Sequence, residues 1–304
     1  PWDAYLVKFN SAGVRQWATY YGGGDGDYGY DAVVDGNSNV YLGGYTSSNS
    51  DIASGGFQNV IGGSYDAFLV KFDEAGTRLW ATYYGGTDSE WEAGGMSITT
   101  DAAENIYLTG QTSSNSNIAS NGFQNIYGGN RDAFLVKFNS AGTRLWATYY
   151  GGTGDDYGKS VATDASGNVY LSGYTESSLG IAFSGLQNVP GGLSDAFLVK
   201  FGSKGERFCS TYYGGMDWDE GTGVAIDNLG NVYLAGAAKS SSGIASNGFQ
   251  NTHGGVTWYD SYLAKLCSCE LTVNITTAFT DIVCSGQCTG TSTVTVNSVC
   301  GISP

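Results

Sequence analysis

The sequence predicts an all-β fold, a β-propeller of four-stranded blades, and three observations support this prediction. A unit of 63 to 66 residues recurs along the chain, each unit contains two hairpin signals, and its strands are apolar on both faces. The composition agrees, because the 304 residues include 48 Gly and 22 Tyr but only 3 Pro. Glycine supplies tight turns and tyrosine suits half-buried sheets, whereas long amphipathic helices need more Leu, Glu, Lys and Ala.

Three phrases return in the same order in each unit. The first phrase is Asp-Ala-aromatic-Leu-Val-Lys-Phe, which begins at Asp3, Asp66, Asp132 and Asp195, with a weaker copy at Asp260. The second is Thr-Tyr-Tyr-Gly-Gly, and the third has the type Val-Ala-Thr-Asp-x-x-Gly-Asn-Val-Tyr-Leu. A rung of a solenoid is usually about 20 to 47 residues long. The longer unit, with its two hairpins, therefore favours a propeller blade over a solenoid coil.

Each unit is expected to contain four short strands, which the motifs order from the propeller axis outward. The expected spans, taken by motif, are 159–164, 168–175, 132–139 and 143–150. A long Ser/Asn/Gly loop, such as residues 113–130, joins the second strand to the third. The small residues of Ser160-Val161-Ala162 fit the crowded strand nearest the axis, and the bulky Trp80 and Tyr84 fit the splayed outer strand.

The number of blades is open at this stage, because only four inner-type strands are visible. Either the propeller is small or it is part of a larger one, and we favour the larger propeller. The chain opens at Pro1 in the middle of a unit, so an upstream segment is expected. The alternative is that the N-terminal strands complete the last blade, although residues 260–266 would then duplicate one of its strands.

Two domains are expected, a propeller at residues 1–266 and a small Cys-containing β segment at residues 267–304. Clustered cysteines in a Gly/Thr-rich β segment indicate disulfides and an oxidising compartment. Five of the six cysteines belong to this segment: Cys267, Cys269, Cys284, Cys288 and Cys300.

The disulfide pairing is only partly suggested by the sequence. Cys284 and Cys288 are close enough in the chain to form a local clip. Cys209 stands where the other units have Trp, so we expect it to pair with Cys267 or Cys269. A zinc site is disfavoured, because Cys-x-Cys spacing is too short for the usual ligand pairs and His253 is the single histidine.

The strong acidity of the chain excludes some partners. It has 13 basic and 28 acidic residues, a formal charge of −15 and a pI near 4.2. Phosphate backbones and anionic membranes attract Lys and Arg, so nucleic acid and direct membrane insertion are not expected. No run of 18 apolar residues is present, which argues against a membrane-spanning helix.

Acidic residues recur in the loop that follows each Gly-Gly pair. Hard cations prefer several oxygen ligands, so these acids are candidate ligands for Ca²⁺, the one cofactor that we consider. The competing interpretation is that each acid caps a turn by accepting backbone N–H bonds, and strict repetition in every unit favours it. The candidate metal ligands are Asp27, Glu90, Asp156 and Asp219. The aspartates that begin the third strands and the strand lysines are assigned to the scaffold, either as repeated ion pairs or with the lysines snorkelling at the blade edges.

Aromatic residues at loop positions where the units differ are better candidates for ligand contact. Aromatic rings stack on sugar faces and anchor protein contacts, although core packing is the competing role for each residue taken singly. The candidate ligand-binding residues are Trp91, Trp218, Trp258 and Tyr259.

The sequence argues against an enzyme. His253 lies in an Asn-Thr-His-Gly-Gly loop without a Ser or Cys motif that would supply a nucleophile. No Gly-Lys-Ser/Thr phosphate loop is present. Paired carboxylates for glycoside cleavage stay open as an alternative, because 28 acids offer many pairs.

The repeat resembles the SBBP family of β-propeller repeats, which occurs in secreted bacterial proteins. The resemblance covers roughly residues 3–266 and depends on the phrases Asn-Val-Tyr-Leu-x-Gly, Asp-Ala-Phe-Leu-Val-Lys-Phe and Thr-Tyr-Tyr-Gly-Gly. The C-terminal segment, from Leu271-Thr-Val-Asn-Ile-Thr through Cys284 and Cys288, resembles the opening of the SprB-type adhesin repeat. That second resemblance implies a Bacteroidetes origin, export by the type IX system and display outside the cell.

Together these features predict a non-catalytic module at the cell surface, used for adhesion or for binding a glycan or a surface protein. It would form part of a surface filament or gliding adhesin, next to other copies or domains of a long fibre. A carbohydrate-active enzyme that uses acids of the propeller face is the first alternative. A purely structural spacer is the second.

Overall fold

The computed structural model describes residues 1–266 except 91–94 and 256–257, and within these ranges every regular element is a β-strand. The predicted second domain lies outside the described residues and stays a prediction. The strands are β1 (Ala4–Phe9), β2 (Arg15–Tyr21), β3 (Asp27–Val34), β4 (Val40–Thr46), β5 (Asp66–Phe72), β6 (Arg78–Tyr84), β7 (Ser97–Thr100), β8 (Ile106–Thr112), β9 (Asp132–Phe138), β10 (Arg144–Tyr150), β11 (Asp156–Thr163), β12 (Val169–Thr175), β13 (Asp195–Phe201), β14 (Arg207–Tyr213), β15 (Asp219–Ile226), β16 (Val232–Ala238) and β17 (Asp260–Leu266).

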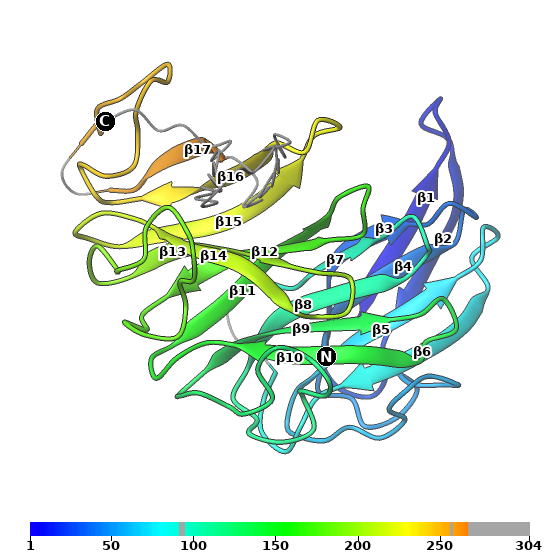
Figure 1. Ribbon diagram of the computed structural model, residues 1–304. Coiled ribbons are helices and arrows are strands. Elements are labelled where there is room, and N and C mark those ends of the chain that lie inside the picture. Colours follow the sequence, from blue (N-terminus) through cyan, green and yellow to red (C-terminus); the bar gives the residue numbers. More distant parts are fainter. Residues whose placement is uncertain (91–94, 256–257, 267–304) are drawn as a thin grey trace, which may run out of the picture.

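These strands form separate antiparallel sheets, which follow one another in a row as propeller blades do (Figure 1). Three sheets have four strands each, β3–β6, β7–β10 and β11–β14, and every one of them uses strands that are consecutive in sequence. The first sheet contains β1 and β2, and the last contains β15, β16 and β17. The predicted fold class is therefore confirmed. The expected grouping of the four strand spans into one unit needs one correction. Residues 159–164 and 168–175 belong to the first two strands of one blade, whereas residues 132–139 and 143–150 belong to the last two strands of the preceding blade.

The strands that open the blades line the axis of the row. A backbone N–H of each inner strand after β3 donates to a side chain of the preceding inner strand. The bonds run from Ile98 to Asp31 (2.9 Å), from Val161 to Ser97 (3.4 Å) and from Val224 to Ser160 (3.2 Å). The small-residue strand is thus the inner one and the Trp/Tyr strand the outer one, as the sequence predicts.

Both faces of a blade are buried against its neighbours, which explains the continuous apolar runs. Phe68 and Leu69 are both fully buried although they point to opposite faces of β5. Phe68 packs with Ala4 and Tyr21 of the preceding sheet, whereas Leu69 belongs to the cluster shared with the next blade. Burying a large aromatic side chain removes roughly 150–250 Å² from water, so these contacts dominate blade stacking.

A Trp on the outer strand fastens each blade to the hairpin of the next. Its indole N–H donates to a backbone carbonyl in that hairpin, and the strand Lys binds the same carbonyl. The bonds join Trp17 to Glu74 (3.0 Å), Trp80 to Ser140 (3.1 Å) and Trp146 to Ser203 (3.0 Å). Each Trp ring lies against a hairpin glycine with positive φ (Gly76, Gly142 and Gly205), where a Cβ would come within 3.0 Å of the ring.

The long loop between the second and third strands covers the edge of the outer strand. In the first full blade, Ser54 and Gln58 form β-bridges with Ala81 and Tyr83 of β6. The same bridges recur on β10 and β14. An exposed strand edge invites pairing with other chains, so this loop protects the rim of the propeller.

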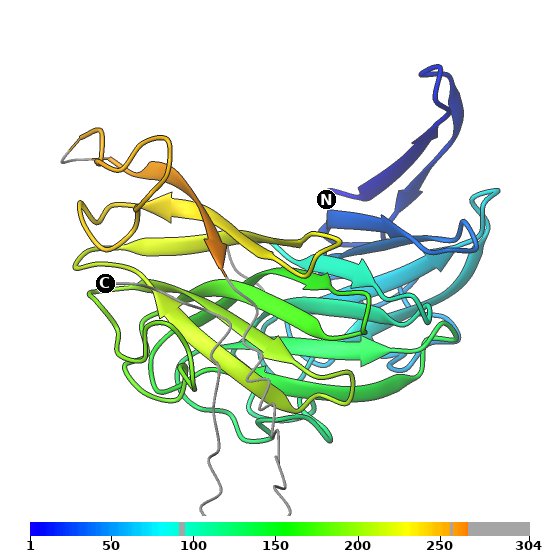
Figure 2. The same cartoon turned by 45° about the horizontal axis from the view of Figure 1, so that its top comes forward.

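The two end sheets are incomplete and stay apart. The first sheet has only strands of the third and outer types, and the described part of the last sheet lacks an outer strand. They lie at opposite ends of the row (Figure 2), and no hydrogen-bonded strand pair joins them within the described residues. The described blades therefore form an open arc, and the N-terminal strands do not complete the last blade.

Glycines within the strands allow a test of this packing. Gly173 of β12 lies so close to the inner strand that a Cβ would be 1.7 Å from the carbonyl oxygen of Tyr157. Gly223 of β15 has no heavy atom nearer than 3.8 Å to its own Cβ position. We expect Gly173→Ala to lower the free energy of unfolding by about 2–4 kcal/mol and Gly223→Ala to change it by less than about 0.5 kcal/mol, in denaturant titrations. Equal losses would contradict the packing described.

Candidate functional site

The candidate site is the face of the propeller on which the Gly-Gly loops lie. There, the acid at the entry to each inner strand and the residue before the preceding third strand come together. The inner-strand acid donates its backbone N–H to the carbonyl of that second residue in each case. The bonds are Asp27 to Trp2 (2.6 Å), Glu90 to Tyr65 (2.9 Å), Asp156 to Arg131 (2.9 Å) and Asp219 to Ser194 (2.8 Å). We call the side chains that flank these acids the Gly-Gly rim.

Three of the four candidate metal ligands, Asp27, Asp156 and Asp219, are the first residues of inner strands, whereas Glu90 lies seven residues before β7; all four are at most 1% exposed. Asp156 shows the shared pattern. It accepts bonds from the Gly152 N–H (2.8 Å), the Ser177 hydroxyl (2.8 Å) and the Thr175 hydroxyl. Equivalent donors surround Asp27, Glu90 and Asp219. These contacts are those of a turn cap.

The Ca²⁺ site stays a prediction. No group of three acidic, His or Cys side chains suited to a metal occurs within the described residues. The donors around the four acids are N–H and O–H groups, and the four acids are buried.

A second buried acid faces each of three inner-strand acids, and the sequence did not reveal it as a partner. Asp132, fully buried, accepts bonds from the Gly128 N–H (2.8 Å) and Gln124 (3.1 Å) through Oδ2. Its Oδ1 has no hydrogen-bond partner. A Cβ on Gly151 would lie 2.6 Å from both this oxygen and Oδ2 of Asp156, so the two carboxyl groups meet across that glycine.

These carboxyl pairs recur at successive blade boundaries. The pairs are Asp66 with Glu90, Asp132 with Asp156, and Asp195 with Asp219. The ion pair expected between a third-strand aspartate and the lysine of the same strand is wrong for Asp66 with Lys71 and for Asp132 with Lys137. Lys71 instead contacts Asp35 (3.7 Å) and Lys137 contacts Asp101 (3.4 Å).

Burial and mutual repulsion set the protonation of the carboxyl pairs. Burial raises the pKa of Glu90 to about 8, and the nearby Asp66 adds to the shift. Burial and Asp156 likewise raise the pKa of Asp132 to about 7. The pKa values of Asp156 and Asp195 rise to about 6, again chiefly through burial. Two carboxyl groups in one site cannot easily both ionise, so the pair favours a shared proton.

This protonation makes stability depend on pH. The folded pKa values of Glu90, Asp132, Asp156 and Asp195 exceed the unfolded values of about 4, so the folded state holds more protons. Their stabilising contribution is complete below about pH 4 and is lost as pH rises toward about 8. Between pH 5 and 8 the free energy of unfolding of Asp132→Asn should fall by about 1–3 kcal/mol less than that of the parent protein, because the variant lacks one titrating group. Asp25→Asn, at an exposed loop position, is the control, and equal pH slopes in the two variants would refute the shared proton.

The candidate ligand-contact aromatics gather on the last blade. Trp258 is 80% exposed and Tyr259 46% exposed, directly before β17, and Trp218 is half-buried directly before β15. Burial and the nearby Glu220, Asp217 and Asp219 raise the pKa of Tyr259. Trp91 lies outside the described residues.

Other rim side chains were missed by the sequence reasoning. At the boundary of β9 and β11, Arg131 binds Asp155 (3.1 Å) and the Tyr157 hydroxyl (3.0 Å). Tyr157 stacks on Tyr174 with ring centroids 4.4 Å apart, and Lys159 lies 5.0 Å from the Tyr174 centroid. In the first full blade the corresponding cluster is Tyr28, Tyr45 and Tyr65. The available signal was position for Arg131 and Tyr157, because each is next to a repeated acid and its residue type differs among the units.

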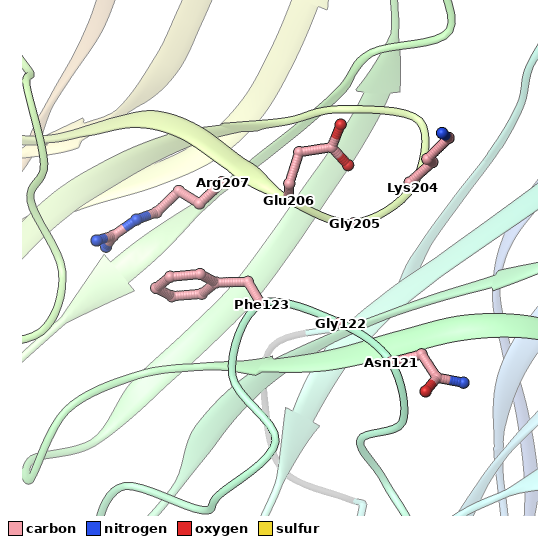
Figure 3. Close-up of a pocket in the computed structure, with 7 residues that line it drawn as sticks. All are labelled: Asn121, Gly122, Phe123, Lys204, Gly205, Glu206 and Arg207. Atoms are coloured by element: carbon pink, nitrogen blue, oxygen red, sulfur yellow. The ribbon is translucent and has the colours of Figure 1, made fainter.

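A shallow groove elsewhere on the molecule belongs to the scaffold. It has a volume of about 490 Å³ and lies between residues 121–123 and 204–207 of neighbouring blades (Figure 3). The Arg207 guanidinium lies 4.2 Å from the Phe123 ring centroid, and Arg144 lies 4.4 Å from Phe57 in the preceding blade. A contact repeated between blades indicates packing, and it gives no reason to place a ligand here.

His253 is held by structural contacts. Its Nε2 lies 3.1 Å from the carbonyl oxygen of Ala238, and its Nδ1 lies 3.2 Å from the Gly255 N–H nitrogen and 3.9 Å from Asp260. None of these groups is a Ser or Cys nucleophile, so the contacts found in the described residues do not form a triad.

Cys209 occupies the Trp position of β14 and is 2% exposed. It lies opposite Lys200, as Trp80 lies opposite Lys71, and it takes part in a disulfide. The remaining cysteines (Cys267, Cys269, Cys284, Cys288 and Cys300) lie outside the described residues, so the pairing stays a prediction.

The spacing within the repeat supports the predicted pairing of Cys209 with Cys267 or Cys269. Each blade-linking Trp binds the residue eight positions after the aspartate that begins the next third strand, such as Ser140 after Asp132. For Cys209 this position is 268, between Cys267 and Cys269. Peptide mapping of the unreduced protein should join Cys209 to one of these two. A link to Cys284, Cys288 or Cys300 would show that the prediction is wrong.

Comparison with known proteins agrees with this architecture. The chain is 26% identical over 242 residues to an uncharacterized WD repeat-containing protein of Acanthamoeba polyphaga mimivirus, covering 68% of the chain and 17% of that protein. It is 30% identical over 114 residues to the regulatory protein FlaEY of Caulobacter vibrioides, covering 37% of the chain and 12% of that protein. The chain thus spans less than a fifth of the length of these curated relatives.

A crystal structure of a protein of unknown function from Bacteroides caccae covers 67% of this chain and 73% of its own, with 9% identity and a TM-score of 0.23. That likeness carries no argument. Among the described residues no helix has the length and apolar character needed to cross a membrane. Residues 16–50 and 145–180 match the family model of the SBBP β-propeller repeat. These two segments are therefore similar to the SBBP type of β-propeller repeat, in agreement with the antiparallel four-stranded sheets described above.

Proposed function

We propose that this protein is a non-catalytic binding module that contacts its ligand through the Gly-Gly rim. One observation carries the proposal. The acids that fix the rim backbone are repeated and buried, whereas the side chains beside them change from blade to blade. A scaffold that repeats and a surface that varies is the arrangement expected when loops of a rigid fold bind a partner.

The chemistry of the rim favours a glycan or a surface protein as the ligand. Trp258 and Tyr259 offer exposed rings, and Arg131, Asp155 and Lys239 offer hydrogen-bonding charges on the same face. Aromatic rings stack on the apolar faces of sugars and anchor protein interfaces. The SBBP repeats and the adhesin-like C-terminal sequence support a role in adhesion outside the cell, as part of a surface fibre.

Binding to an array of bacterial and eukaryotic glycans tests this function. We expect saturable binding without release of reducing sugar, and a loss of about tenfold in affinity for the double variant Trp258→Ala/Tyr259→Ala. Phe249→Ala is the matched control, because Phe249 is fully exposed but lies nine residues before Trp258, in the part of the loop that corresponds in sequence to the segment covering the outer strand in the other blades. Its affinity should equal that of the parent protein.

Three outcomes would contradict the proposal. Hydrolysis of a glycan that a single Asp→Asn change abolishes would show an enzyme. Binding that the double variant leaves intact would place the contact away from the rim aromatics. Absence of binding to glycans and to intact bacterial surfaces would favour a structural spacer.

A further inference from the structure

Three inner strands contain a β-bulge near their beginning, and the extra residue differs from one strand to the next. The register of β11 shifts between Gly158 and Ser160, so Lys159 is not paired with a residue of β12. The equivalent residues are Tyr30 in β3 and Thr222 in β15. A bulge turns a side chain away from the regular alternation of its strand, and bulges are frequent beside functional sites. The repeat thus has a position next to the Gly-Gly rim at which the side chain varies.

Lys159 is the charged member of this set, and its ammonium lies beside two tyrosine rings of the rim. The centroids of Tyr157 and Tyr174 are 4.4 Å apart, and the ammonium nitrogen lies 5.5 Å from the first and 5.0 Å from the second. It therefore lies at the side of the stacked pair, because on the outer face of one ring it would be much farther from the other. Within the described residues this ammonium makes no hydrogen bond and no ion pair. Its three N–H donors can thus bind oxygen atoms of a ligand.

Glu220 of the next blade lies near this ammonium. β15 runs beside β11 and β12 (Figure 1), and a Cβ on Gly221 would be 2.8 Å from the carbonyl oxygen of Gly173. Glu220 precedes Gly221 and Tyr174 follows Gly173, so these two side chains start from neighbouring points on the two blades. The Glu220 carboxylate acts to raise the pKa of Lys159 and so opposes the larger effect of burial, which lowers it. An acid of one blade thus lies near a base of the other.

Bases and acids are matched on this part of the rim. Ion pairs join Arg131 to Asp155 (3.1 Å) and Lys239 to Asp217 (3.4 Å), and all four side chains stay partly exposed. Lys159 and Glu220 are the third base and the third acid. A ligand with a net charge of either sign would therefore meet like charges. A hydroxyl group both donates and accepts hydrogen bonds, so a ligand with many hydroxyls and no charge matches these side chains.

We propose that this part of the rim binds an uncharged glycan in preference to an acidic one, with Lys159 and Glu220 contacting the same sugar. This ligand class rests on the proposed function of the rim. The Lys159 ammonium donates to one hydroxyl oxygen, and a hydroxyl of the same sugar donates to the Glu220 carboxylate. A carboxylate or sulfate on the glycan would be repelled by Glu220 and by the exposed Glu176, whose N–H binds the Asp155 carbonyl at 2.9 Å.

Pairs of glycans that differ only in one acidic group test the preference. Neutral oligosaccharides that the intact chain binds on the array are compared with their sialylated or sulfated counterparts in equilibrium titrations. The neutral member should bind at least about tenfold more tightly. The difference should shrink at high salt, because salt screens the repulsion between exposed charges.

Variants of the protein test the residues. Lys159→Met keeps the apolar stem but removes the donors, so it should weaken binding of the neutral glycan by about tenfold or more. Its free energy of unfolding should not fall, because the ammonium has no hydrogen-bond acceptor in the described chain. Lys204→Met is the matched control, since Lys204 is exposed on the hairpin between β13 and β14, and it should leave binding unchanged. Glu220→Gln should raise the affinity for acidic glycans relative to neutral ones by about threefold or more.

Three results would overturn the proposal. Acidic glycans could bind as tightly as their neutral counterparts, or Lys159→Met could retain the parent affinity; either result leaves the proposed function of the rim intact. Lys159→Met could instead lose stability together with affinity, which would make Lys159 a scaffold residue. Absence of binding to every glycan would also overturn the proposal, and binding to intact bacterial surfaces would then decide whether the proposed function fails with it.

Discussion

Phe68, Phe134 and Phe197 occupy the same place in successive blades, and each is fully buried against the sheet that precedes it. This burial of every sheet between two others is the constraint on which the structure depends. A four-stranded sheet that is apolar on both faces is not stable alone in water. The indole and lysine bonds to the neighbouring hairpin then fix the distance and angle at which the faces meet.

The sequence could predict what is local to one unit. The hairpins, the strand spans and the order from axis to edge follow from turn residues and from the size of side chains, as Ser160-Val161-Ala162 and Trp80 show. Contacts between residues of different units could not be predicted in this way. Asp132 and Asp156 belong to adjoining blades and meet only because the sheets stack across Gly151. Repetition suggested a structural role for each acid but did not show that they face one another.

The proposed binding face depends both on features local to one unit and on contacts between units. The buried acids hold the loop backbone in the same conformation at every blade boundary, and that uniformity lets the neighbouring side chains change without cost to the fold. Sequence reasoning found Trp258 and Tyr259 because large aromatics stand out in a loop. It missed Arg131, Tyr157 and Tyr174, which appear as ordinary strand-end residues until the fold brings them into one cluster.

The Trp links join each blade only to the next, and this has a mechanical consequence. A pulling force applied to the two ends of the arc passes through the blades in series, with no closing strand pair to share the load in the described chain. Each blade can then yield separately and release its 63 to 66 residues, about 200 Å of extended chain. An arc of this kind lengthens in steps under tension, which absorbs work before any single attachment is broken.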